Sequence, residues 1–78
     1  MQPDIRINLR SVIKDRGYIQ AVIARKANLS ATKLSQILNL DRKLEANELF
    51  DVCSAIGMTP MELKNYETSM PDKQAESL

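Results

Sequence analysis

The 78-residue sequence contains no histidine, no tryptophan and a single cysteine, Cys53. Without histidine there is no His-based catalytic triad or proton shuttle, and one cysteine forms neither a Cys/His zinc cluster nor an internal disulfide. Proline and glycine are scarce, at three and two residues, and no apolar run approaches the roughly 20 residues of a membrane span. These absences exclude most metal and nucleophilic chemistry, and we expect a cytoplasmic protein with no cofactor and no membrane contact.

The composition that remains is that of one small globular domain. Hydrophobic residues make up 44% and charged residues 27% of the chain, which is a folded rather than a disordered balance. A chain of this length is near the lower limit for folding alone, because it buries only about 60% of its unfolded surface. We therefore expect no separate domain that senses a small-molecule ligand.

Charge is divided unevenly along the chain, although the net charge is only +1. Residues 1–43 carry nine basic and three acidic side chains, a net +6, whereas residues 44–78 carry two basic and seven acidic ones, a net −5. The basic half is a candidate face for a polyanion. The alternative is that the two halves pair with each other or are simply solvated, and charge alone does not decide between these interpretations.

Apolar residues recur at the helical period of 3.6 residues in several places, and no strand pattern is present. Helices are predicted from about Ile5 to Arg16, from Tyr18 or Ile19 to Ala27, and over Ala31–Leu38. Two more are predicted, one from about Glu45 up to Gly57 and one from Pro60 to about Glu67. The fold class is therefore all-α, with five helices.

Capping residues mark the ends of these helices. Asp4 and Ser30 are predicted N-caps, and Gly17 and Gly57 predicted stops. The segment Thr59-Pro60-Met61-Glu62 is a capping box with proline at the first helical position. We expect the folded domain to cover residues 1–67, with a flexible tail over residues 68–78, where the sequence has a proline, small polar residues and no period.

The second and third helices have the spacing of a helix-turn-helix, two short helices joined by a tight turn. Ala24 provides the small side chain that a close helix crossing needs, and Asn28 tolerates the left-handed backbone of the turn. Apolar residues suited to locking the pair follow the same pattern: Ile23, Ala27, Leu29, Leu34 and Ile37.

With these residues in place, the chain resembles the lambda-repressor-like, Cro-type (XRE-type) helix-turn-helix family of phage and bacterial transcriptional regulators. The resemblance extends over about residues 7–63 and rests on the segment IQAVIARKANLSATKLSQI and the ending LFDVCSAIGMTPMEL. It implies a compact five-helix domain that binds double-stranded DNA. It further implies a transcriptional regulator, most simply a repressor, that acts as a homodimer on a palindromic operator and reads the major groove with its third helix.

The resemblance also implies which residues contact DNA. Candidates for reading base edges are the solvent-facing positions of the third helix: Ala31, Thr32, Lys33, Ser35 and Gln36. Candidates for binding phosphates lie around it: Gln20, Asn39, Arg42, Lys43, Arg10 and Arg16. The residue types are suitable, because glutamine pairs with adenine, lysine donates to guanine and threonine packs on thymine. Lys33, like Arg25, is alternatively only a solvated charge.

Two positions depart from the family pattern. The turn usually contains glycine, and Glu-x-Gly usually follows the third helix, where this chain has Asn28 and Leu38-Asn39-Leu40. Asparagine is a mild replacement in a turn, but Leu40 makes the path of the following loop hard to predict.

Three apolar residues near the C-terminal end are assigned from their spacing. Met61 is expected in the core, whereas Met58 and Tyr66 are either core residues or contacts in a dimer interface. Cys53 lies in the apolar stripe of the fourth helix, and we expect a small core residue there, because no cationic group lies near it to activate a thiolate.

Two other classes of function compete with a DNA-binding regulator. The first is an antitoxin or immunity-type module that uses the helix-turn-helix as a scaffold and binds a basic protein through its acidic half. The second, an enzyme, is disfavoured because the chain has no glycine-rich phosphate loop, metal cluster or activated nucleophile.

Overall fold

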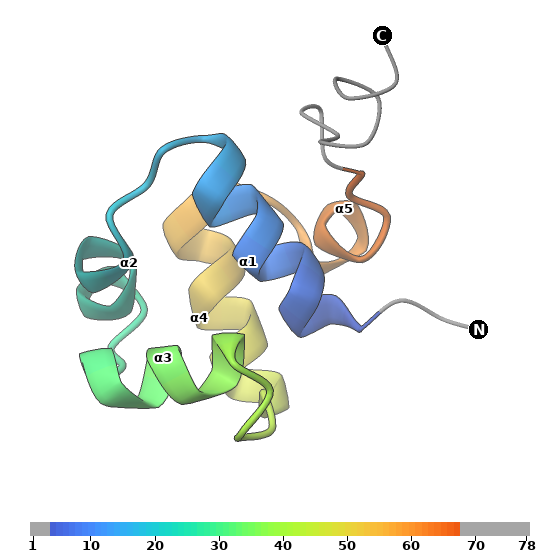
Figure 1. The fold of residues 1–78 in the computed structure, drawn as a ribbon. Coiled ribbons are helices and arrows are strands. Elements are labelled where there is room, and N and C mark those ends of the chain that lie inside the picture. The colour runs from blue at the N-terminus through green and yellow to red at the C-terminus, as the bar shows by residue number, and fades with distance from the viewer. Residues whose placement is uncertain (1–3, 68–78) are drawn as a thin grey trace, which may run out of the picture.

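The computed structural model describes residues 4–67, which form five helices and no strand (Figure 1). In chain order these are α1 (Ile5–Asp15), α2 (Gln20–Lys26), α3 (Ala31–Leu38), α4 (Ala46–Ile56) and α5 (Pro60–Lys64). The predicted all-α class is confirmed. The predicted tail at residues 68–78 lies outside the described residues.

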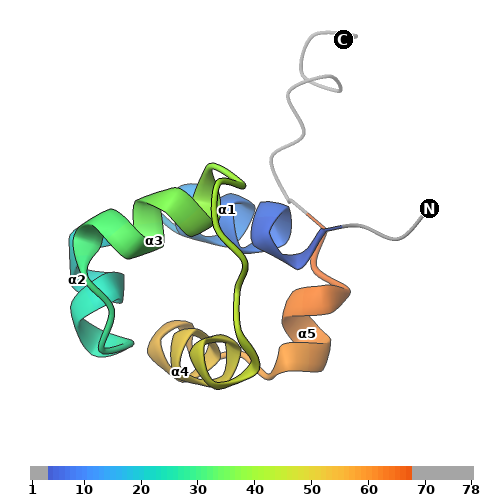
Figure 2. The ribbon, with the colours of Figure 1, turned by 90° about the horizontal axis from the view of Figure 1, so that it is seen from below.

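The helices pack around one core, with α3 against α1 and α2, and α5 against α1 and α4. Viewed along the direction of Figure 2, α3 and α4 lie on two sides of the domain, α2 contacts both, and the loop at residues 39–45 runs from the end of α3 to the start of α4. This arrangement leaves one face of α3 uncovered by any described element.

Three of the five helices begin at the residue that the sequence predicted. The Asp4 carboxylate accepts from the backbone N–H of Arg6 at 2.9 Å, and the Ser30 hydroxyl accepts from the N–H of Lys33 at 3.0 Å, as N-caps should. The capping box at α5 is reciprocal, because the Glu62 side chain accepts from the Thr59 N–H while the Thr59 hydroxyl accepts from the Glu62 N–H. Both bonds satisfy backbone donors that the helix itself cannot.

Two helix bounds differ from the prediction. α2 begins only at Gln20, because Ile19 is extended and occupies the N-cap. α5 ends at Lys64 rather than near Glu67, because the buried Asn8 side chain binds its last carbonyls. The Asn8 amide nitrogen donates to the carbonyl of Leu63 at 2.9 Å and to that of Lys64 at 3.0 Å. No sequence pattern identified Asn8, whose partners are more than fifty residues away along the chain.

The first four helices end in the same hydrogen-bonded motif, which requires a left-handed residue just after the helix. Gly17 and Gly57 fill this position after α1 and α4, with φ of 68° and 71°. After α2 it is Asn28, as expected, with φ of 62°. After α3 it is Leu40, with φ of 65°, so the backbone is left-handed at the position where the resemblance leads one to expect glycine.

Leu40 therefore predicts a stabilising substitution. A left-handed backbone costs a non-glycine residue roughly 1–2 kcal/mol, part of which glycine returns as extra freedom in the unfolded chain. Leu40→Gly should raise the free energy of unfolding by about 0.5–1 kcal/mol, measured by chemical denaturation. The matched variant Asn28→Gly should change it by only a few tenths of a kcal/mol, because asparagine tolerates this conformation. A loss of stability in Leu40→Gly would show that contacts of its side chain, 41% exposed, outweigh the strain.

The core is formed by the apolar stripes that the periodicity predicted. Its buried members come from all five helices and the turn after α2: Leu9, Val12, Ile13, Ile23, Ala24, Ala27, Leu34, Leu38, Val52, Cys53, Ile56 and Leu63. Burial raises the pKa of the Cys53 thiol, which agrees with the expected structural role. Met61 was wrongly expected in this core. It is 63% exposed, because α5 is a single short turn that inserts Leu63 and leaves the neighbouring positions outside.

Candidate nucleic-acid interface

The segment from α2 to α3 forms the predicted helix-turn-helix. Ala24 and Ala27 are buried where the two helices approach, and Leu29 packs against the core from the turn. The Leu29 N–H donates to the carbonyl of Ala24 at 2.8 Å, which is possible because Asn28 turns the chain back. Ser30 then starts α3 at a fixed angle to α2. Two short helices joined by this tight turn, with the second exposed, define the helix-turn-helix class of DNA-binding fold.

α3 has one buried and one exposed face, as the sequence predicted. Leu34, Ile37 and Leu38 are buried. On the other side, Ala31, Thr32 and Gln36 are exposed and Ser35 is partly exposed. Ser35 is also reached by the Asn39 amide, whose nitrogen lies 3.5 Å from the Ser35 hydroxyl. The exposed set is short and polar, so its hydrogen-bonding groups are available to a ligand as large as a duplex.

Lys33 differs from the other four residues proposed to read bases. Its ammonium lies 2.6 Å from Oε2 of Glu48 in α4. The other carboxylate oxygen of Glu48 accepts from the backbone N–H of Glu45 at 3.0 Å. The Lys33 ammonium, followed by the Glu45 N–H, lowers the pKa of Glu48. At this point the basic and acidic halves of the chain do pair with each other.

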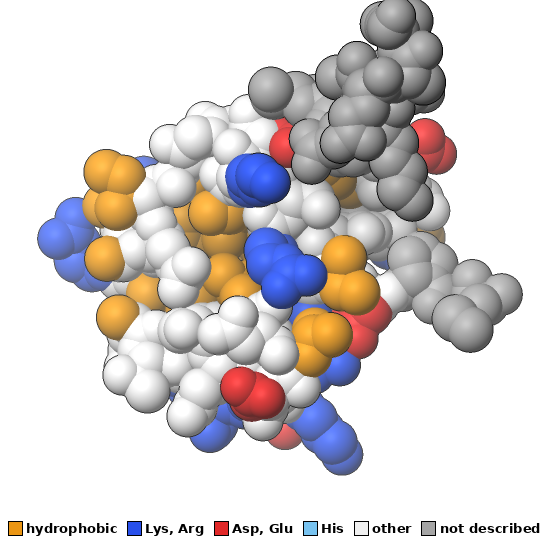
Figure 3. Space-filling view, in the orientation of Figure 1, with side chains coloured by type: hydrophobic (Ala, Val, Ile, Leu, Met, Phe, Trp, Pro, Cys, Tyr) orange, Lys and Arg blue, Asp and Glu red, His pale blue; other side chains and the backbone are white. Residues whose placement is uncertain are grey.

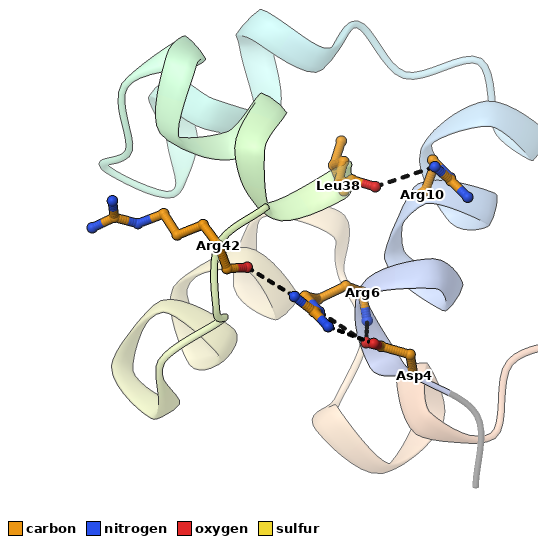
Figure 4. Close-up of polar contacts among 5 residues, drawn as sticks. All are labelled: Asp4, Arg6, Arg10, Leu38 and Arg42. Carbon is orange, nitrogen blue, oxygen red and sulfur yellow. Dashed lines mark hydrogen bonds and ion pairs between the residues drawn. The ribbon is translucent and has the colours of Figure 1, made fainter. Parts of the chain in front are cut away.

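Two arginines of α1 hold the end of α3 and the loop that follows it (Figure 4). Arg6 binds the Asp4 carboxylate through two nitrogens and donates a third bond, at 3.0 Å, to the carbonyl of Arg42. Arg10 donates to the carbonyl of Leu38 at 3.3 Å. The side chain of Arg42 points away from this network, as Figure 4 shows. The backbone of the loop is thus fixed while its cationic side chain stays exposed.

The Arg6 network also shifts two pKa values. Hydrogen bonds from the side chain and the backbone of Arg6 lower the pKa of Asp4, and the Asp4 carboxylate raises that of Arg6. Each shift favours the charged form, so the ion pair between Asp4 and Arg6 stabilises the guanidinium that also binds the loop.

The structure brings together most, but not all, of the residues predicted to bind phosphate. Asn39, Arg42 and Lys43 lie in the loop directly after α3 and are exposed, and Arg10 reaches the end of the same helix. Gln20 is exposed at the first position of α2. Arg16 lies elsewhere.

Arg16 follows α1 at the end of the domain remote from α3 (Figure 1). Its guanidinium donates to the carbonyl of Ile56, the last residue of α4, at 3.4 Å. Glu48, which contacts α3, is eight residues earlier, or about 12 Å along the helix axis. A hydrogen bond with Tyr18 raises the pKa of Arg16. These contacts indicate that Arg16 joins the end of α1 to the end of α4.

The two residues predicted as either core or dimer contacts are both partly buried within the chain. Met58 packs against the core, and the Tyr66 hydroxyl donates to the Asp15 carboxylate at 2.7 Å, which raises the pKa of Tyr66. Sequence reasoning gave no role to Phe50, which is 60% exposed on α4.

Basic side chains project from the domain over the side that carries α2 and α3. Figure 3 shows Lys and Arg side chains along the left and lower edges of that view, where Figure 1 places these helices. Over residues 4–67 no helix is long and apolar enough to cross a membrane. The same residues contain no cluster of three or more potential metal-binding side chains.

The comparison with protein families agrees with this geometry. The family of Cro/C1-type HTH DNA-binding domains matches residues 8–69. The chain belongs to this family, whose domains bind double-stranded DNA in transcription regulators. No curated protein sequence matches the chain.

Solved structures of regulators share the fold. The DNA-binding domain of the P22 C2 repressor superposes with a TM-score of 0.77 at 17% identity, over 91% of this chain and 93% of that one. The restriction-modification controller protein C.AhdI from Aeromonas hydrophila gives 0.71 at 19% identity, over 76% and 89%. The clp gene regulator ClgR from C. glutamicum gives 0.71 at 24% identity, over 80% and 86%. At these identities the likeness shows the fold alone.

Proposed function

We propose that the protein is a transcriptional repressor that reads the major groove of its operator with α3. The observation that carries this proposal is the uncovered polar face of α3, with Thr32 and Gln36 exposed on a helix whose other face is fixed in the core. An α-helix fits the major groove, and an amide side chain pairs with adenine there through two hydrogen bonds. Ala31 and Ser35 complete the surface that meets the bases.

Phosphate contacts orient this helix in the groove. The donors for these contacts come from the start of α2, from the loop after α3 and from α1, whose Arg10 reaches the last residue of α3: Gln20, Asn39, Arg42, Lys43 and Arg10. Such contacts position a protein on DNA without reading its sequence. The hydrogen bond from Arg6 to the loop and that from Arg10 to the end of α3 keep those donors in a fixed relation to α3.

The repressor acts as a homodimer on a palindromic operator in the cytoplasm. One copy of α3 reads only a few base pairs, so two copies with half-sites about one helical turn apart supply the specificity that one copy lacks. Met58 and Tyr66 are the proposed contacts between the copies, together with the neighbouring Met61, whose exposed side chain is the most available of the three. We also propose that the folded DNA-binding domain spans residues 1–67.

Selection of binding sites from random duplex DNA tests the proposal. We expect an enriched palindrome, and a steep loss of affinity for it between low and moderate salt, because each neutralised phosphate releases counterions. Enrichment of a site without dyad symmetry would contradict the homodimer. No enrichment by the folded protein would contradict the repressor and favour a protein-binding module whose partner binds the acidic half.

Arg42 provides a test of phosphate binding. Its side chain is exposed while its backbone carbonyl is held by Arg6, so Arg42→Ala removes the cation and leaves the loop tied. We expect weaker binding to all duplex sequences alike and a salt slope flatter by about one unit, measured by titration at several salt concentrations. Lys64→Ala removes the same charge from α5, which does not pack against α3, and should leave the slope unchanged. Equal effects of the two variants would contradict the assigned docking face.

A further inference from the structure

The ion pair between Lys33 and Glu48 stands apart from the other charges of the domain. Lys33 is the third residue of α3 and Glu48 the third residue of α4. These two helices lie on different sides of the domain (Figure 2), and the pair at 2.6 Å spans the space between them. The other basic residues around α3 differ from Lys33: Arg6 pairs with Asp4, two residues away in the chain, and donates to a backbone carbonyl, Arg10 donates to a backbone carbonyl, and Arg42 and Lys43 are exposed.

Glu48 is a fixed and largely covered acceptor. Its side chain is only 12% exposed, whereas that of Lys33 is 32% exposed. One carboxylate oxygen is anchored by the N–H of Glu45 and the other faces the Lys33 ammonium. For Lys33 to turn to a phosphate, it would have to leave a carboxylate that already holds its ammonium at 2.6 Å and is itself fixed by the Glu45 N–H. Arg42 also acts on Glu48, but only through its longer-range charge.

We propose that Glu48 withholds the Lys33 ammonium from DNA, so that Lys33 positions α3 against α4 and Glu48 limits binding to DNA of any sequence. This inference rests on the proposed DNA-binding mode and refines it, because it removes Lys33 from the residues that read bases. A lysine free at the start of α3 would attract phosphates on every duplex and gain no sequence preference.

The test compares salt slopes on a nonspecific duplex and on the selected operator. Glu48→Gln keeps an acceptor for the Glu45 N–H but removes the charge that holds Lys33. We expect a slope steeper by about one unit on both duplexes, so that the ratio of Kd at 200 mM to Kd at 50 mM salt rises about 3.5-fold. Lys33→Gln should leave the slope of the wild-type protein unchanged. The double variant should return to the wild-type slope.

The matched control is Glu62→Gln. Glu62 is also the third residue of its helix and accepts the N–H of its N-cap, Thr59, at 2.8 Å, but no lysine within residues 4–67 forms an ion pair with it. It therefore reports the effect of losing one negative charge, and we expect its slope to equal that of the wild type.

Three results would overturn the inference. One is a slope flattened by about one unit in Lys33→Gln, which would show that Lys33 contacts phosphate in the wild-type complex. Another is a steeper salt slope in Glu48→Gln that persists in the double variant. The steeper slope would then come from the lost interaction between the charges of Glu48 and Arg42, and not from Lys33. The third is an equal gain in Glu62→Gln. Helical circular dichroism verifies folding, and if Glu48→Gln did not fold, Lys33→Gln alone decides. A wild-type protein that binds neither duplex would instead contradict the proposed function.

Discussion

Leu34→Ala is expected to lower the free energy of unfolding by about 2–5 kcal/mol, the range for truncating a fully buried leucine. Leu34 is completely buried on the inner face of α3, and its removal leaves a cavity where α3 meets α1 and α2. Since small domains are stable by only about 5–15 kcal/mol, this loss is a large share of the total. Chemical denaturation measures it directly.

Gln36→Ala is the control for that variant, because Gln36 lies two residues away on the exposed face of the same helix. Its free energy of unfolding should stay within about 0.5 kcal/mol of the wild type, as for most surface substitutions. A loss in Leu34→Ala no greater than that in Gln36→Ala would mean that α3 is not anchored through Leu34.

The second large effect is expected on DNA binding. Gln36→Ala, the control for the unfolding experiment, is here the variant under test. Gln36→Ala should weaken binding to the selected operator by about 1–3 kcal/mol and relax the preference at one base pair, because the side chain is proposed to pair with an adenine. Titration of the operator and of its single-base variants measures both quantities.

Nonspecific duplex provides the comparison for Gln36. Gln36→Ala should bind it as the wild type does, whereas Arg42→Ala should weaken binding to operator and nonspecific duplex by the same factor. If Gln36→Ala also weakened all sequences equally, Gln36 would be a phosphate contact and the orientation of α3 in the groove would be wrong.

Much of the fold was predictable because its signals are local. Caps such as Asp4 and Ser30 and the capping box at α5 act within three residues, so their residue types and spacing identify them. The apolar stripe of each long helix predicted the core for the same reason. Prediction failed where position depended on distant segments, as for Met61, which α5 turns outward.

The candidate site shows the same division. The exposed face of α3 followed from its period, and of the five residues that the resemblance assigns to it the structure leaves Ala31, Thr32 and Gln36 exposed, Ser35 partly exposed and Lys33 paired with Glu48. Arg16 looked equivalent to Arg10 in the sequence, since both are basic residues of the predicted first helix. Arg10 lies in the middle of that helix and Arg16 at its C-cap, however, and one reaches α3 while the other reaches the end of α4.

The sequence by itself determined the helices, their caps, the buried stripes and membership of a helix-turn-helix family, because each depends on residue types at short spacing. Only the tertiary structure decided which charges meet. It pairs Lys33 with Glu48, ties Arg6 to the loop after α3, and lets Leu40 adopt a conformation that suits glycine. Those contacts join residues brought together by packing, and packing is a property of the whole core that no local pattern contains.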